Sequence, residues 1–359
     1  MTVLDLDSAV AGAVTPSRAS AMRRLAPLVP VAAVLAALLV GAALIIIEGA
    51  PPLDVYRTVV RGVTSSSFGW RDTLVQATPL ATIGIGLAVA YRARVFTIGA
   101  EGQYLIGATA ATAVVTAPAL VELPGAVLVP LGVVVAIAAG AAWSGISAGL
   151  NSRFGTSVVI SSLLLNYVAA AVLAWAIRTT IRDPEGFVPQ SRPLGGAVLG
   201  TLPGVDVHAG VLAVVVLLPV TAIALTRTRA GFLVDIHGHN PDALDAHEAP
   251  RRRVLWGVLL ACGAITGLAG FVQTAGVTER LTADAGVGYG FTAIVVAVLG
   301  RLRPLGVVIA ALLLAAMTIG FESAEREFGL PASLVGIIEA LIVLFIVVGD
   351  GMLVRWGDR

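Results

Sequence analysis

The sequence predicts an all-α integral membrane protein with about ten transmembrane helices, and three features of its composition support this fold class. Hydrophobic residues make up 57% of the 359 residues, charged residues only 13%, and the mean hydropathy is +0.94. A soluble protein of this length usually has about a quarter of its residues charged. The chain also holds 40 glycines, and small residues let helices in lipid pack closely. We therefore expect the lipid bilayer to be the main solvent of this chain.

The first prediction from the pattern along the chain is where it crosses the membrane. A spanning helix needs about 20 apolar residues. Ten apolar stretches have about the required length: Leu25–Ile47, Thr73–Tyr91, Gly102–Val121, Gly125–Asn151, Gly155–Ile177, Ala209–Leu225, Val254–Thr278, Ala285–Gly300, Pro304–Phe321 and Leu330–Gly349. The first is too long for a signal peptide, so we expect it to be a retained span. The eighth is short and begins with glycines, which suits a half-helix or a steeply packed span.

The distribution of arginines predicts the orientation. If residues 1–24 are cytoplasmic and ten spans alternate, 15 arginines lie inside and 8 outside, in accord with the positive-inside rule. This arrangement makes residues 25–349 a transmembrane domain and residues 350–359 a second cytoplasmic tail. It also makes residues 227–253 the one sizeable cytoplasmic loop. The two sizeable external segments are then Glu48–Asp72 and the proline-rich Arg178–His208, which we expect to be an irregular but ordered cap.

Several protein classes are excluded by what the sequence lacks. The net charge of +1 gives no reason to expect nucleic-acid binding. A single cysteine, Cys262, lies in an apolar run, so neither a disulfide framework nor a thiolate–metal site can form. The four histidines do not form a metal cluster, and we expect no metal. The phosphate-cradling sequence GxxxxGK[ST] does not occur, so the chain cannot hydrolyse nucleotide by that route.

Polar residues inside the apolar stretches are the first candidates for function. Glu101 and Gln103 lie beside two glycines at the start of the third stretch, whereas Ser162 and Asn166 share one face of the fifth. Ionisable residues at membrane depth are costly and usually face a cavity or a partner. Glu101 could instead cap the helix that follows it, and Ser162 and Asn166 could form ordinary interhelical hydrogen bonds. Glu339 lies near the centre of the last stretch with no other charge nearby in the sequence.

The loop at residues 227–253 contains a signal for a short helix. Asn240 followed by Pro241 is typical of an N-cap residue and the first position of a helix. Ala243 and Leu244 would then present small and apolar contact surface, so the helix at Gly238–Ala249 would suit docking of a soluble partner. Elsewhere, Gly145-x-x-x-Gly149 and Gly263-x-x-x-Gly267 each place small residues on one helical face. We expect both to serve helix packing within the chain.

Four segments, taken in order, resemble one family of membrane proteins. Phe96–Gln103 is similar to the FNIGAEGQ motif of the permease subunits of ATP-binding-cassette (ABC) importers for simple sugars and nucleosides, relatives of the branched-chain amino acid permeases. Val158–Tyr167 resembles their VISTLMLNYI stretch. Gly288–Ile294, continuing to Arg301 and Pro304–Gly306, resembles GFGFDAIAVALLGRxxPLG. Gly238, Asn240, Pro241 and Ala243 match the G-x-NPEAA loop, which docks on the ATPase.

The resemblance implies a function, a set of partners and a location. The chain would be a permease with a type II-like fold, closest to the longer permease of nucleoside importers, in a bacterial plasma (inner) membrane with both termini cytoplasmic. It would pair with a second, shorter permease, a cytoplasmic ABC ATPase that binds the ATP, and an extracellular lipid-anchored solute-binding protein. It would be no enzyme and hold no cofactor of its own. Translocation candidates are Glu101, Gln103, Ser162, Asn166, Phe291 and Glu339, and ATPase-coupling candidates are Gly238, Asn240, Pro241, Ala243 and Leu244.

Some residues depart from the family pattern, and other functions stay open. Thr97 replaces the asparagine of the family motif, Asp235 stands where an arginine often precedes the docking loop, and Glu339-Ala340 replaces a common Gln-Gly pair. The same machine could carry a simple sugar or a purine base. An ion-coupled secondary transporter would use Glu101 and Glu339 as relays, and a membrane enzyme is a more distant alternative.

Overall fold

The computed structural model describes residues 28–65, 67–240, 251–285 and 288–334, together with residues 336–338, 340–341, 344–345 and 348. Glu339 and residues 241–250 therefore lie outside the described residues. The described chain is helical, apart from turns, short loops and three isolated β-bridges. It divides into two units, one drawn from Met1–Val59 and Phe321–Arg359 and the other from Val60–Gly320. Each unit is described by itself.

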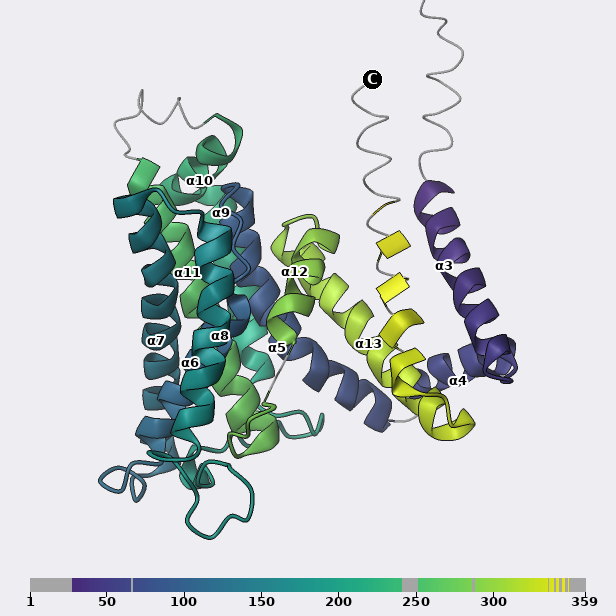
Figure 1. The fold of residues 1–359 in the computed structure, drawn as a ribbon, viewed down its shortest axis with the longest axis horizontal. Coiled ribbons are helices and arrows are strands. Elements are labelled where there is room, and N and C mark those ends of the chain that lie inside the picture. The colour runs from purple at the N-terminus through teal and green to yellow at the C-terminus, as the bar shows by residue number, and fades with distance from the viewer. Residues whose placement is uncertain are drawn as a thin grey trace, which may run out of the picture. The chain divides into compact units, whose positions relative to one another are not determined.

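The helices follow the apolar stretches of the sequence closely (Figure 1). Each of the first nine stretches coincides with one of these described helices: α3 Leu28–Ile47, α5 Ser67–Arg92, α6 Ala100–Val115, α7 Gly125–Phe154, α8 Val158–Ala176, α9 Val211–Arg227, α11 Arg251–Gln273, α12 Tyr289–Leu299 and α13 Pro304–Phe328. Five of the described helices are long and apolar enough to cross a membrane: α5, α7, α8, α13, and α11 with its π-helical extension Thr274–Thr278. The number rises to seven if each of two bent helix pairs forms one span. The chain is thus an all-α multi-pass membrane protein, and ten spans remain a prediction.

Helices α6 and α12, which coincide with two of the apolar stretches, are too short to cross the bilayer alone. The 16 residues of α6 and the 11 residues of α12 rise about 24 and 17 Å, against a hydrocarbon core of about 30 Å. The eighth apolar stretch therefore forms a half-helix, which is one of the two forms expected for it. Short helices in a membrane leave irregular backbone at depth, and other parts of the protein must satisfy its peptide groups.

Helix α11 lies at the centre of the larger unit and packs against α5, α6 and α7. The contact is close because glycines face each other. A Cβ atom on Gly263 would overlap the carbonyl oxygen of Gly140, and one on Gly107 would overlap the backbone of Gly267. Gly263 and Gly267 therefore serve helix packing within the chain, as predicted. Figure 1 shows the resulting bundle, in which α6, α7, α8 and α11 run side by side.

The Gly145-x-x-x-Gly149 pair does not make such a close approach. A Cβ on Gly145 would lie 3.4 Å from a methyl carbon of Leu260, and one on Gly149 would lie 3.8 Å from the ring of Trp256. These are ordinary van der Waals distances to side chains of α11. The second glycine pair thus contributes packing within the chain without backbone contact.

A further helix, α4 (Pro52–Thr64), forms where the sequence suggested only an external segment. It follows α3 after a bend of 114°. The hydroxyl of Tyr56 donates to the carbonyl of Leu38 at 2.7 Å, and Thr58 donates to the carboxylate of Glu327 at 3.1 Å. These bonds join α4 to α3 and to the end of α13 in the smaller unit. Charged residues interrupt the sequence of α4, so its amphipathic pattern contains no uninterrupted apolar stretch.

The Arg178–His208 segment is irregular, as expected, and is fixed by backbone bonds to the chain that follows α11. Ser191 donates to the carbonyl of Leu281 at 2.8 Å, and Leu194 donates to that of Glu279 at 3.0 Å. An ion pair between Asp183 and Arg280 adds a side-chain link. The segment thus covers one end of the bundle, next to the π-helical end of α11.

Candidate functional site: the start of α6 and the α9–α10 corner

Two side chains of α8 hold the irregular backbone that leads into α6. Asn166 accepts a hydrogen bond from the N–H of Gly102 at 2.9 Å and donates one to the carbonyl of Ile98 at 2.8 Å. The hydroxyl of Ser162 accepts from the N–H of Ile98 at 3.1 Å. Both side chains are buried. Because peptide groups outside a helix need partners within the protein at membrane depth, Asn166 and Ser162 fix the entry into α6. Interhelical hydrogen bonding, one of the alternatives for these residues, is therefore confirmed for Asn166, which bonds to Gly102 of α6, whereas Ser162 bonds to Ile98, before that helix.

The carboxylate of Glu101 caps a helix far away in the sequence. One oxygen accepts from the N–H of Gly288 and the other from the N–H of Gly290, both at 2.8 Å. These donors lie at the N-terminus of α12, where unpaired N–H groups and the helix dipole favour negative charge. Glu101 is only 6% exposed. The sequence suggested a cap for α6, the helix that Glu101 itself begins, but the carboxylate caps α12 because that N-terminus abuts the start of α6.

Further polar side chains surround the same region. Gln103 is 2% exposed, and its amide oxygen lies 3.7 Å from the thiol of Cys262 on α11. A Cβ on Gly102 would lie 3.0 Å from Nε1 of Trp143. That indole nitrogen is buried and has no hydrogen-bond partner among the described residues, and the same holds for the hydroxyls of Ser144, beside Trp143 in α7, and of Thr266, one turn of α11 beyond Cys262. The start of α6 is therefore a buried polar region where α6, α7, α8 and α11 meet.

The sequence predicted only part of this polar region. Gln103, Ser162 and Asn166 were among the predicted candidates and lie in this region. Glu101, also a candidate, lies beside them in the first turn of α6, but its carboxylate is bonded to the N-terminus of α12. Trp143 was missed, since a tryptophan in an apolar stretch gives no polar signal. Phe291 is 44% exposed in the first turn of α12, so it does not join the buried polar groups. Glu339 lies outside the described residues.

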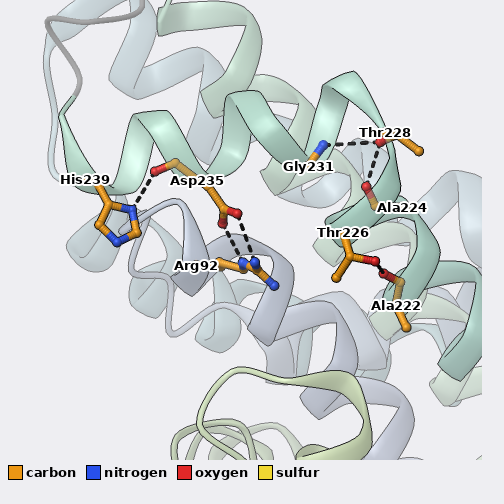
Figure 2. Close-up of polar contacts among 8 residues, drawn as sticks. All are labelled: Arg92, Ala222, Ala224, Thr226, Thr228, Gly231, Asp235 and His239. Atoms are coloured by element: carbon orange, nitrogen blue, oxygen red, sulfur yellow. Dashed lines mark hydrogen bonds and ion pairs between the residues drawn. The ribbon is translucent and has the colours of Figure 1, made fainter.

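A second site lies where α9 turns into α10 (Arg229–His239), with a bend of 69° between the two helices. Thr228 forms the corner. Its hydroxyl donates to the carbonyl of Ala224 at 2.6 Å and accepts from the N–H of Gly231 at 3.2 Å (Figure 2). The side chain thus satisfies the end of one helix and the start of the next, which is the usual role of an N-cap threonine.

Helix α10 is bound to the end of α5 and to the residue after it by an ion pair and a hydrogen bond. Arg92 and Asp235 form a two-point ion pair, with N–O distances of 2.5 and 2.9 Å (Figure 2). His237 lies 2.8 Å from the carbonyl of Ala93 through its Nδ1. A Cβ on Gly238 would overlap the carbonyl oxygen of Arg92. Asp235, one of the departures from the family pattern, is therefore a partner of Arg92, a pairing that sequence distance concealed.

The coupling candidates are only partly described. Gly238 belongs to the last turn of α10, and Asn240 follows that helix with an extended backbone at φ −148° and ψ 91°. The expected helix over Gly238–Ala249 therefore begins too early, because Gly238 belongs to α10. An extended backbone is also what an N-cap residue adopts, so a helix after Asn240 stays a prediction. Pro241, Ala243 and Leu244 lie outside the described residues.

Comparison with known proteins gives the family. Residues 70–347 match the family described as branched-chain amino acid transport system / permease component. Among curated relatives, the glucose ABC transporter permease protein TsgB13 of Haloferax volcanii is 38% identical over 89% of this chain and 87% of its own. The guanosine ABC transporter permease protein NupP of Bacillus subtilis is 31% identical over 89% and 92%. The nucleoside ABC transporter permease protein NupB of Lactococcus lactis is 27% identical over 89% and 90%.

Two further results complete the comparison. Each of these organisms also contributes a second permease protein, at 24–28% identity over 67–75% of this chain. No solved structure matches. The family match covers most of the chain and includes the start of α6, α10 and the N-terminus of α12. The chain therefore belongs to the branched-chain amino acid transport system / permease component family.

Proposed function

We propose that this chain is the membrane-spanning permease subunit of an ATP-driven ABC importer for a nucleoside. The observation that carries the proposal is the family match over residues 70–347, together with two relatives that are named as guanosine and nucleoside permeases. A simple sugar is the second candidate, because the relative at 38% identity is named as a glucose permease. Both solutes carry a hydroxylated ring, which needs several hydrogen-bonding groups in an otherwise apolar path.

The buried polar region at the start of α6 is the best candidate for part of that path. Buried polar atoms normally have hydrogen-bond partners, yet Trp143 Nε1, Ser144 Oγ and Thr266 Oγ1 have none among the described residues. Solute hydroxyls or ring nitrogens could bond to these three groups. Ser162 and Asn166, whose hydrogen bonds go to the backbone, would position α6 rather than contact solute.

The contacts of α10 suggest how ATPase closure would reach this region. A force on the loop after α10 passes to the end of α5 through the pair Arg92–Asp235 and the bond from His237 to Ala93. From there, the hydroxyl of Tyr91 donates to the carbonyl of Thr97 at 2.6 Å, directly before α6. Movement of α10 would thus shift the start of α6. The nucleotide chemistry would belong to the ATPase, and this chain would supply no catalytic group.

The proposal includes a topology and partners. Both termini and the loop at residues 227–253 would be cytoplasmic, and Arg178–His208 would be external, in a bacterial plasma membrane. Cysteine labelling from outside, in a Cys262→Ala background, should modify a cysteine at Gln190 and spare one at His239. The partners would be a cytoplasmic ATPase, a lipid-anchored binding protein and a second permease. The second permease proteins found in all three organisms support the last of these.

The test is uptake by cells that lack their own nucleoside import and express this chain with its partner subunits. Labelled guanosine should accumulate, and excess unlabelled nucleoside should suppress this accumulation more strongly than excess glucose. Absence of guanosine accumulation, together with accumulation of labelled glucose in the same cells, would assign the sugar instead. In the same cells Ala243→Arg should abolish uptake and ATPase co-purification, whereas Asn240→Ala should weaken them mildly, since losing an N-cap costs about 1 kcal/mol. Normal uptake in Ala243→Arg would refute the coupling role.

A further inference from the structure

A cavity of about 520 Å³ lies among α5, α9, α10 and α11, and none of the described residues that line it belongs to the polar region at the start of α6. Its walls are almost entirely apolar: Val89, Ala224, Leu225, Leu233, Val258 and Ile265 contribute, with the corner residues Ala230 and Gly231. Among the described residues that line the cavity, Thr221 alone carries a hydroxyl, and it already donates to the carbonyl of Leu217 at 2.6 Å. The walls of this cavity therefore suit hydrocarbon and give a polar solute no free hydroxyl.

The cavity runs along α11 for much of that helix. Its lining includes Arg253, Gly257, Ala261 and Ile265, which lie four residues apart and so on one helical face. The twelve helical rises from Arg253 to Ile265 correspond to a length of about 18 Å. A Cβ on Gly257 would meet no atom within 4 Å, so this position opens into free space. This lined face of α11 is long enough for one extended acyl chain, and we call the cavity the slot.

Two arginines stand at one end of the slot. Arg229 begins α10 and Arg253 lies in the first turn of α11, and both are exposed. Neither has a hydrogen bond or ion pair within the described part of the chain, and none of the described residues that line the cavity carries a carboxylate. The nearby Asp235 is already paired with Arg92. Cations in the first turn of a helix oppose the helix dipole, so a bound anion would offset this cost at both helix starts.

From this combination we infer that the slot binds one anionic phospholipid of the surrounding membrane. The headgroup phosphate lies between Arg229 and Arg253, and one acyl chain lies along Gly257, Ala261 and Ile265. Arginine-rich surfaces at a membrane boundary attract anionic lipid at about 1 kcal/mol per residue, and the apolar slot adds burial of hydrocarbon. Because the lipid contacts both arms of the α9–α10 corner, its binding also stabilises the position of α10 against α11.

The experiment measures lipid bound to the permease complex, purified with its partner subunits and reconstituted in nanodiscs of equal phosphatidylglycerol and phosphatidylcholine. Native mass spectrometry gives the ratio of the two lipids retained. The test variant is Arg229→Gln/Arg253→Gln, and the matched control is Arg227→Gln/Arg252→Gln. The control removes the same charge from the neighbouring arginines, which do not line the slot. A third variant, Gly257→Phe, fills the slot and leaves the charge unchanged.

Wild type should retain phosphatidylglycerol over phosphatidylcholine. Each arginine should contribute about fivefold to the preference for phosphatidylglycerol. The ratio of phosphatidylglycerol to phosphatidylcholine should therefore be roughly 25-fold lower in the test variant, while the control stays near wild type. Gly257→Phe should also lose the bound lipid. If Gly257→Phe does not assemble into the complex, Ala261→Leu fills the slot with a smaller side chain and should give the same result. Equal loss in test and control would overturn the site, and so would displacement by inorganic phosphate or by guanosine. Retention in both filling variants would overturn the acyl-chain slot. These readouts do not require transport, so failure here is distinct from failure of the proposed importer function.

Discussion

Replacing Glu101 by alanine leaves two N–H groups at the start of α12, those of Gly288 and Gly290, without their acceptors. Each hydrogen bond is 2.8 Å long and has a charged acceptor, and bonds of this kind contribute about 1.5–3 kcal/mol each. The N-terminus of α12 also loses a favourable charge. Alanine removes the cost of burying a carboxylate as well, which offsets part of the loss. We expect a net destabilisation of about 3 kcal/mol.

Glu101→Gln separates charge from hydrogen bonding. The amide keeps one acceptor oxygen but turns an NH₂ donor toward the second N–H. We therefore expect the stability of Glu101→Gln to lie between that of wild type and that of Glu101→Ala. Unfolding in mixed micelles of increasing SDS content measures the free energies, with the exposed Glu122→Ala as control, for which a change within about 0.5 kcal/mol is expected. Equal stability of Glu101→Ala and wild type would contradict the capping role. If uptake survived in Glu101→Gln at every pH, a proton-relay role for this residue would be excluded.

Three other predictions concern single contacts. Asn166→Ala removes two buried hydrogen bonds to the backbone at the start of α6, those with Ile98 and Gly102, and should cost about 2–4 kcal/mol of stability. A loss below about 1 kcal/mol in the same unfolding assay would argue against this role of Asn166. A double-mutant cycle of Arg92→Ala and Asp235→Ala should give a coupling of about 1 kcal/mol, because the pair is two-pointed but partly exposed, whereas additive single effects would contradict the link. Burial lowers the pKa of His208 below its usual value, so the folded state disfavours the charged ring. The free energy of unfolding should therefore be constant above about pH 6.5. Below that pH it should fall, by at most about 1.4 kcal/mol per pH unit. His208→Asn should flatten this dependence, and an unchanged slope in that variant would assign the effect to another group.

The sequence predicted the helices better than their breaks and partners. Apolar stretches are set by lipid contact, so nine of them coincide with helices of the described chain. The shortness of α12 was also readable, from the glycines that precede it. The 114° bend before α4 and the 69° corner at Thr228 were not, because a bend depends on which helix packs nearby rather than on the local run of residues.

The polar sites show the same limit. Glu101, Ser162 and Asn166 could be selected because polar groups at membrane depth are costly, but their partners lie 64 to 189 residues away. Nothing local identifies Gly288 or Gly290 as the donors for Glu101. Asp235 was visible only as a departure from the family pattern, and only the packing of α10 on α5 makes it a partner of Arg92.

The measurement that tests the central claim most directly is the energy source of transport. The complete complex is reconstituted in proteoliposomes with labelled guanosine, its binding protein and enclosed ATP, and a protonophore collapses any proton gradient. An importer permease should continue to accumulate solute with ATP and the protonophore present, and should stop when ATP is replaced by a non-hydrolysable analogue. Accumulation that persists without ATP hydrolysis but stops with the protonophore would contradict the account, and would make this chain an ion-coupled transporter.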